Sequence, residues 1–224
     1  MPSSDHDQLL PFIDRAEAGR ILGMKLLTYY GRKDVVVLGL PRGGVPVAFE
    51  VARVLNVQWD VLVVRKLGIP WERELAMGAI ASGGVEIFDL SMVKQLHVPD
   101  EAMREVAATE RKELERQEQL YRGNRKPPSL DGKTVILVDD GIATGACTLA
   151  AIAAVRRQNA AQVVVAVPVA PADASRTLRM EADEVISLAE PQKFLAVSEW
   201  YENFGQISDE EVRHLLEKSV PSAA

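Results

Sequence analysis

Two adjacent carboxylates, Asp139 and Asp140, stand at the end of an apolar run and precede a turn of small residues. The run, residues 135–138, predicts a short buried strand, and the Ala-rich stretch after Gly145 predicts a helix. In open α/β sheets, ligands bind just beyond the carboxyl ends of strands. A small-residue turn opening a helix offers backbone N–H groups and a positive dipole end to a phosphate. Carboxylates accept bonds from a ribose diol or lie near a divalent cation. Together these features indicate a site for a sugar phosphate.

Residues 135–148 also resemble a known family signature. They look like the phosphoribosyl-diphosphate (PRPP) motif of type I phosphoribosyltransferases, which has an apolar strand, two acidic residues, three variable residues, Thr-Gly, one residue, and Ser or Thr. The chain departs from the motif at its last position, where Cys147 stands and Thr148 follows. The alternative is an ordinary strand–turn–helix with surface aspartates.

The resemblance implies a role for each part of this turn. The N–H groups of residues 143–147 and the Thr144 hydroxyl would hold the 5-phosphate of PRPP, and the two aspartates would face the ribose hydroxyls. The thiol near the helix N-terminus could have a lowered pKa, although we expect it to replace a small hydroxyl side chain rather than to act as a nucleophile. The predicted binding residues here are Asp139, Asp140, Gly141, Ile142, Ala143, Thr144, Gly145, Ala146 and Cys147.

A second candidate loop, GLPRGG at residues 39–44, follows another buried apolar run. Its glycines allow backbone amides to approach an anion, and Arg42 adds a planar guanidinium. The loop resembles the pyrophosphate loop of the same family, with Pro41 in place of a serine. The alternative is a tight turn with a surface arginine. The predicted pyrophosphate-binding residues are Pro41, Arg42, Gly43 and Gly44.

A third candidate is the basic pair Arg65 and Lys66, placed at the end of a strand predicted over residues 60–64. The Gly/Pro-containing stretch 67–74 then predicts a loop. This arrangement resembles the start of the family's catalytic flexible loop, which closes over pyrophosphate and excludes water. The alternative is a solvated basic pair. The catalytic residues predicted for the chain are Arg42, Lys66 and Asp140.

The acceptor side of the expected site is less well defined. In the family the acceptor binds under a variable hood built from chain-terminal segments. Trp200, Tyr201 and Phe204 could stack on a planar base there. The alternative, a small hydrophobic patch that docks the last helix, remains open. The motifs do not identify the acceptor.

The resemblance implies Mg²⁺ as the cofactor. In this family the metal is held largely by PRPP itself and by water, so Asp139 and Asp140 are expected to contribute indirectly. The three histidines, His6, His97 and His214, have no spacing that suggests a metal site.

The composition is that of a globular protein. Apolar residues make up 47% of the 224 residues and charged residues 26%, with a formal charge of −6. The low pI, about 5.2, argues against a nucleic-acid-binding surface. One cysteine excludes an internal disulfide. The N-terminus has no signal-peptide pattern, and the apolar runs fall short of the roughly 20 residues that cross a bilayer. We therefore expect a cytoplasmic protein without membrane contact.

The order of elements predicts the fold class. Strands at residues 35–40, 60–64, 135–138, 163–167 and 184–188 alternate with helices, which predicts an α/β fold. We expect one phosphoribosyltransferase-like domain with three layers: an open, mostly parallel sheet with helices on both faces. Its core would span about residues 31–190, with a charged helical insertion at about 91–126 and a C-terminal hood and helix at about 190–220. A homodimer is possible.

The predicted function is transfer of phosphoribosyl from PRPP to a nitrogenous base or amine, with release of pyrophosphate. The pattern resembles a group of uncharacterised bacterial-type phosphoribosyltransferases that share GLPRGGVPVA, VRKLG and ELAMGAIA. The alternative is a non-catalytic PRPP- or nucleotide-binding regulatory protein on the same fold. Arg42 and the basic pair favour an enzyme, because a sensor need not stabilise departing pyrophosphate.

Overall fold

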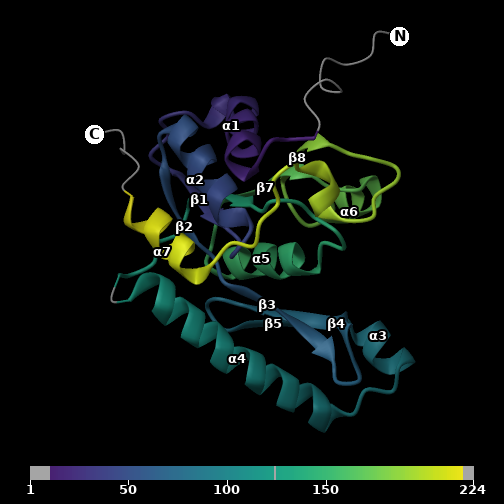
Figure 1. Ribbon diagram of the computed structural model, residues 1–224. Coiled ribbons are helices and arrows are strands. Elements are labelled where there is room, and N and C mark those ends of the chain that lie inside the picture. Colours follow the sequence, from purple (N-terminus) through teal and green to yellow (C-terminus); the bar gives the residue numbers. More distant parts are fainter. Residues whose placement is uncertain (1–10, 124, 219–224) are drawn as a thin grey trace.

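A five-stranded parallel sheet forms the centre of the protein (Figure 1). The computed structural model describes residues 11–123 and 125–218, except for the side chains of residues 73 and 74. The strand order is β2-β1-β6-β7-β8, so β1 and β6, which precede the two glycine-containing loops, are neighbours. The strands are β1 (Val35–Gly39), β2 (Gln58–Val61), β6 (Thr134–Val138), β7 (Gln162–Val169) and β8 (Glu184–Ala189).

Helices cover both faces of this sheet, as the alternating pattern predicts. Successive side chains of a strand point to opposite faces. Val35 and Val37 of β1 pack with α1 (Arg15–Lys25), the 3-10 helix η2 (Leu27–Tyr29) and α2 (Gly44–Leu55). Val36 and Leu38 pack on the other side with α5 (Ala146–Arg157) and α6 (Ala172–Leu178). The predicted three-layer α/β architecture is therefore confirmed.

A separate antiparallel sheet lies where the sequence predicted a strand over residues 60–64 and a loop over residues 67–74, so both predictions are wrong in their bounds. Strand β2 ends at Val61, and residues 64–69, partly assigned to a loop, form β3 (Val64–Ile69). This strand pairs with β4 (Glu72–Ala81), which pairs with β5 (Val85–Phe88). Gly68 and Pro70 had indicated a loop, but Gly68 lies at a register shift in the β3–β4 ladder and Pro70 lies in the two-residue turn. A bulge and a tight turn carry the same residue types as a longer loop.

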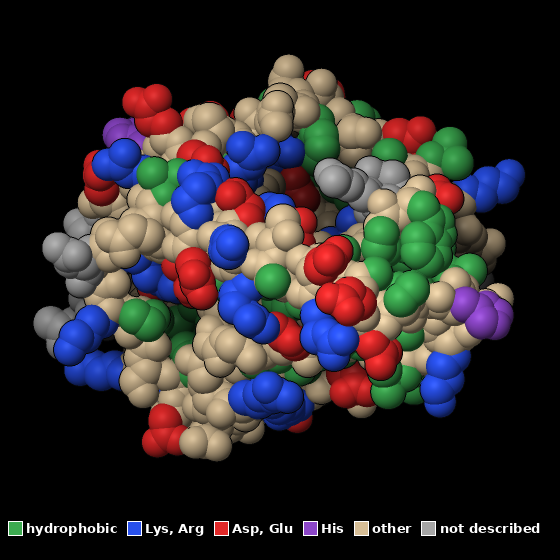
Figure 2. All heavy atoms as spheres, turned by 90° about the horizontal axis from the view of Figure 1, so that it is seen from below, with side chains coloured by type: hydrophobic (Ala, Val, Ile, Leu, Met, Phe, Trp, Pro, Cys, Tyr) green, Lys and Arg blue, Asp and Glu red, His purple; other side chains and the backbone are tan. Residues whose placement is uncertain are grey.

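The charged insertion contains two helices, α3 (Leu90–Gln95) and α4 (Asp100–Arg122). Along α4, Ala107, Leu114 and Tyr121 are buried against the antiparallel sheet and the last helix, α7 (Asp209–Glu217). The helix lies along the three-stranded sheet (Figure 1). Acidic and basic side chains alternate over the face seen from below, where α4 lies (Figure 2). The three buried side chains of α4 are therefore enough to dock this otherwise charged helix.

The C-terminal segment returns to the start of the chain. The 3-10 helix η3 (Val197–Trp200) leads to Tyr201, which bridges Phe12 in parallel fashion. Helix α7 begins at a capping box, in which Ser208 and Glu211 satisfy each other's backbone N–H groups. Helix α6, in contrast, begins after Pro171 and has no cap from a side chain in the described part of the chain. Among the described residues, no helix combines the length and apolarity needed to span a membrane.

Candidate active site

The two glycine-containing loops meet at one edge of the main sheet. Strands β1 and β6 run in parallel with Gly39 opposite Val138, so both chains leave the sheet side by side. A Cβ added to Gly43 would lie 2.0 Å from a carboxylate oxygen of Asp140, and one added to Gly44 would lie 2.7 Å from the Cα of Asp139. Glycine is required because the GLPRGG loop lies directly against the paired aspartates. The peptide bond between Pro41 and Arg42 is cis.

The turn after the aspartates presents an open helix N-terminus. Gly145, the N-cap of α5, has a φ of +80°, in the left-handed region that favours glycine. No described side chain caps this helix, so its first N–H groups stay available to a ligand. Ile142 anchors the turn through a 2.9 Å bond from its N–H to the Val169 carbonyl, while Ala143 and Thr144 are exposed. The geometry suits an anion such as a phosphate.

The two aspartates are electrostatically unlike surface carboxylates. Burial raises the pKa of Asp139 well above its usual value, and the neighbouring charge of Asp140 raises it further. Burial also raises the pKa of Asp140, opposed by its bonds to Arg15. The Asp139 carboxylate accepts a 2.8 Å bond from the backbone N–H of Asp140. Two largely desolvated carboxylates facing an open loop gain stability from hydroxyl donors or a cation.

Arg15 is a site residue that the sequence analysis missed. Its Nε lies 2.8 Å from Asp140 Oδ2, and another guanidinium nitrogen donates to the Gly205 carbonyl at 2.8 Å. The guanidinium also lies 3.8 Å from the Phe204 ring centroid. Both partners of the ion pair are mostly buried. No sequence motif marks Arg15, because its function depends on contacts more than a hundred residues away.

The C-terminal aromatic residues pack against the N-terminal segment. Tyr201 is buried, lies 5.6 Å from Phe12 and 5.0 Å from Phe204 between ring centroids, and donates a hydrogen bond to the backbone carbonyl of Asp140. Burial raises its pKa. The alternative from the sequence was a hydrophobic patch that docks the last helix. A patch does form, but Tyr201 packs there with Phe12 and Ala18 of the N-terminal segment and not with α7. Stacking of Trp200, Tyr201 and Phe204 on an acceptor stays a prediction.

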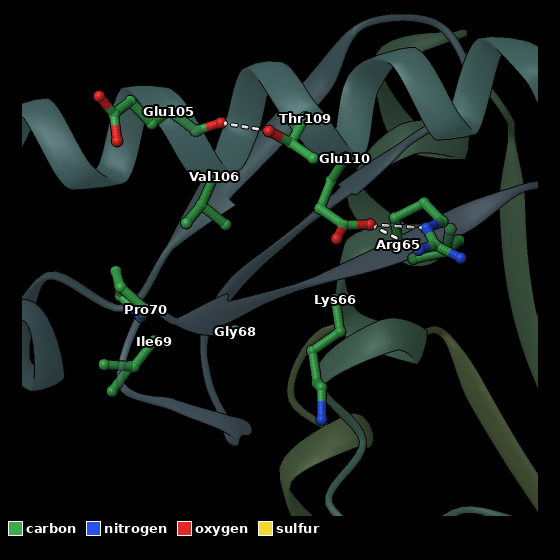
Figure 3. A pocket seen from close by; sticks show the side chains of 10 residues that line it. Arg65, Lys66, Gly68, Ile69, Pro70, Glu105, Val106, Thr109 and Glu110 are labelled. Atoms are coloured by element: carbon green, nitrogen blue, oxygen red, sulfur yellow. Dashed lines mark hydrogen bonds and ion pairs between the residues drawn. The ribbon is translucent and has the colours of Figure 1, made fainter.

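Arg65 and Lys66 point to opposite faces of β3 (Figure 3). Arg65 turns toward α4 and forms an ion pair with Glu110 at 2.6 Å, while Lys66 extends away from that helix (Figure 3). The positive charges of Lys66 and Arg65 both lower the pKa of Cys147, and that of Lys66 has the larger effect, so both residues lie near the signature turn. Lys66, which extends away from α4, stays the candidate for a residue that closes over pyrophosphate, whereas Arg65 contacts α4 (Figure 3).

A cavity of about 590 Å³ opens between β3 and α4 (Figure 3). The hairpin contributes one wall with basic and apolar residues, and α4 contributes the other with carboxylates and a hydroxyl. The Thr109 hydroxyl already donates to the Glu105 carbonyl within the helix. The size is sufficient for a small organic ligand. The lining includes Arg65, Lys66, Ile69, Glu105, Val106 and Glu110.

Cys147 differs from the sequence expectation of a lowered pKa. Burial raises the pKa of its thiol, and the charge of Asp139 raises it further. These effects exceed the opposing influence of the Lys66 and Arg65 charges. A thiol in this environment stays protonated at neutral pH, as a substitute for a hydroxyl would.

The described residues hold no group of three or more His, Cys, Asp or Glu side chains that could bind a metal ion. Two carboxylates, Asp139 and Asp140, do converge on the signature turn, and one of them is paired with Arg15. This donor set fits a cation that takes most of its ligands from a bound phosphate and water.

Comparison with known proteins defines the class of this fold and site. The family model described as the Phosphoribosyl transferase domain matches residues 13–203, and the chain belongs to this family. A curated Mycobacterium tuberculosis protein named "Putative phosphoribosyl transferase Rv0571c" is 47% identical over 208 residues. The match covers 93% of this chain and 47% of the relative, so the chain spans about half the length of the curated relatives it matches.

A solved structure supports the same assignment. The crystal structure of TT1426 from Thermus thermophilus is 40% identical, with a TM-score of 0.80, and the match covers 96% of this chain and all of that one. The antiparallel hairpin and insertion therefore belong to a fold already observed in a relative.

Proposed function

We propose that the protein transfers a phosphoribosyl group from PRPP to a nitrogenous acceptor and releases pyrophosphate. The observation that carries the proposal is the meeting of two glycine-containing loops on adjacent strands, with Gly43 and Gly44 packed against Asp140 and Asp139. Membership of the Phosphoribosyl transferase domain family supports it. One loop alone would suit many phosphates, whereas two loops flanking paired carboxylates suit a ribose with phosphates at both ends.

In the proposed complex, each group of PRPP has a partner in the chain. The N–H groups at the start of α5 and the Thr144 hydroxyl bind the 5-phosphate. Asp139 and Asp140 accept from the ribose hydroxyls, and Arg15 fixes the orientation of Asp140. Arg42 and Lys66 stabilise the negative charge that grows on the leaving pyrophosphate. Tyr201, bonded to the Asp140 carbonyl, holds the C-terminal segment over the turn.

Mg²⁺, when bound with PRPP, would supply further charge neutralisation at the leaving group. Asp139 and Asp140 would face it through PRPP oxygens and water. The chain's own contribution is to orient the sugar and to keep bulk water from the reacting carbon.

The test is release of pyrophosphate from PRPP and Mg²⁺ in the presence of a panel of purine and pyrimidine bases, amines and amino acids. We expect one acceptor class to give release that depends on Arg42. The second candidate function, a regulator that binds PRPP or a nucleotide, predicts tight PRPP binding with no release for any acceptor. Absence of both binding and release would contradict the proposal.

A further inference from the structure

Asp209, at the start of α7, contacts two arginines from distant parts of the chain. Its Oδ1 lies 3.9 Å from a guanidinium nitrogen of Arg42, and its Oδ2 lies 3.7 Å from one of Arg116. Arg42 belongs to the GLPRGG loop, and Arg116 belongs to the insertion helix α4. Two guanidinium groups that contact one carboxylate must lie close to each other, so α4 places a second positive charge beside the glycine loop.

The Asp209 carboxylate, which contacts both arginines, is itself held in position. The Tyr121 hydroxyl, on α4, donates to Asp209 Oδ1 at 2.6 Å, and the Tyr121 ring is buried between α4 and α7. Burial and this bond raise the pKa of Tyr121, so the hydroxyl remains a donor at neutral pH. The capping box of α7 fixes the backbone around Asp209. The position of Arg116 relative to Arg42 is therefore set by packed elements.

Arg116 has the freedom to take a ligand. Its side chain is 52% exposed, and it shares its donors between Asp209 and Glu113, one turn away on the same helix. A guanidinium carries five N–H donors, and the exposed Glu113 pair contributes little stability. Exchange of these carboxylates for a phosphate would keep the Arg116 charge paired and leave the half-exposed Glu113 to solvent.

Binding of pyrophosphate would explain why two arginines lie side by side next to the GLPRGG loop. It carries several negative charges over two phosphoryl groups, and the GLPRGG loop supplies one charged side chain, Arg42. Planar guanidinium groups bind phosphoryl oxygens with bidentate geometry. We propose that Arg116 is a second pyrophosphate-binding residue, delivered by the insertion helix and placed beside Arg42 by Asp209. This inference rests on the proposed function and gives the insertion helix a role in it.

The test is calorimetric titration of the full chain with Mg²⁺ and three probes: inorganic pyrophosphate, PRPP and ribose 5-phosphate. For Arg116→Gln, we expect pyrophosphate and PRPP to bind about tenfold or more weakly, the scale of one charge-assisted hydrogen bond. Binding of ribose 5-phosphate, which lacks the pyrophosphate, should be unchanged. Arg116→Lys should recover part of the loss. The matched control is Arg104→Gln, an exposed arginine nearer the other end of α4, which should bind all three probes as the natural protein does.

Two results would overturn the inference. Pyrophosphate binding by Arg116→Gln that equals that of the natural protein would show that Arg116 does not touch the leaving group. An equal loss for ribose 5-phosphate would show that the substitution acts through the fold. If the natural protein binds neither PRPP nor pyrophosphate, the proposed function itself fails, and this outcome is distinct from the other two.

Discussion

The buried charge of Asp139 lowers the stability of the free protein and, in this account, contributes to ligand binding. Its carboxylate is desolvated and stands beside the charged Asp140, and both effects raise its pKa. In the free protein this charge is unfavourable, because the unfolded chain solvates it fully. A ligand that offers hydroxyl donors would relieve the conflict. The same carboxylate would then destabilise the free fold and contribute to binding.

Asp139→Asn should therefore stabilise the ligand-free protein at pH 7 by about 1 kcal/mol or more, the scale of a poorly compensated buried group. The folded-state pKa is raised, so the natural protein recovers stability as the pH falls toward the ordinary value of 3.8. The difference in the free energy of unfolding between the natural protein and Asp139→Asn should therefore shrink as the pH falls from 7 toward 3.8. Urea unfolding at several pH values measures it, with the exposed Asp131→Asn as control. A destabilised variant at pH 7 would contradict this account.

Cys147 offers a second prediction, which follows from its raised pKa. Alkylation by iodoacetamide at pH 8 should be slower than for a free thiol, and it should accelerate above pH 9. The reaction is simple to follow because the chain has one cysteine. Cys147→Ser should keep or tighten PRPP binding, and Cys147→Ala should cost about 1 kcal/mol or less. Loss of turnover in Cys147→Ser with PRPP still bound would identify the thiol as a nucleophile.

At the scale of elements, the sequence predicted the parallel core because its strands are continuous apolar runs separated by helices of ordinary length. The edge where the glycine loop and the aspartates meet follows from the order of β1 and β6. The β3–β4 hairpin was not predicted, since Gly68 and Pro70 are as typical of a loop as of a bulged hairpin. Arg15 was also missed, because a long-range ion pair leaves no local pattern.

The hairpin gives a prediction that separates two adjacent basic residues. Lys66→Gln should weaken PRPP binding, because Lys66 extends away from α4 (Figure 3) and its charge acts on Cys147 of the signature turn more strongly than that of Arg65 does. Arg65→Gln should leave PRPP binding nearly unchanged and reduce the free energy of unfolding by up to about 1 kcal/mol, since it loses the Glu110 ion pair with α4. Calorimetry and urea unfolding of both variants provide the comparison. Equal effects on PRPP affinity would mean that the residues act as a pair.

At the scale of the whole molecule, helix α4 of the insertion is attached to the rest of the protein at two places. Helix α4 packs on the antiparallel sheet and α7, and its last turn is tied to the main sheet through Asp60. This carboxylate is 2% exposed and accepts from Arg122 and Arg125, each at 3.1 Å. The same helix carries Arg116 toward the GLPRGG loop. A loosened insertion should therefore affect both stability and pyrophosphate binding.

Asp60→Asn tests this connection. Removing the charge takes from the mostly buried Arg122 the shorter of its two ion pairs, with Glu118 remaining at 3.4 Å, which should lower the free energy of unfolding by about 2 kcal/mol. Pyrophosphate affinity should fall as well, while ribose 5-phosphate affinity should not. Urea unfolding and calorimetry provide the two readouts. A loss below about 0.5 kcal/mol would show that the tie between α4 and the main sheet is not stabilising.

The central claim is that the paired aspartates and the turn after them bind PRPP. Calorimetric titration of PRPP with Mg²⁺ into the natural chain and into Asp139→Asn with Asp140→Asn tests it most directly. We predict that the natural chain binds PRPP and that the double variant, still folded by circular dichroism, binds it at least about a hundredfold more weakly, the scale of two charge-assisted hydrogen bonds. Equal PRPP affinity in the two proteins would contradict the claim.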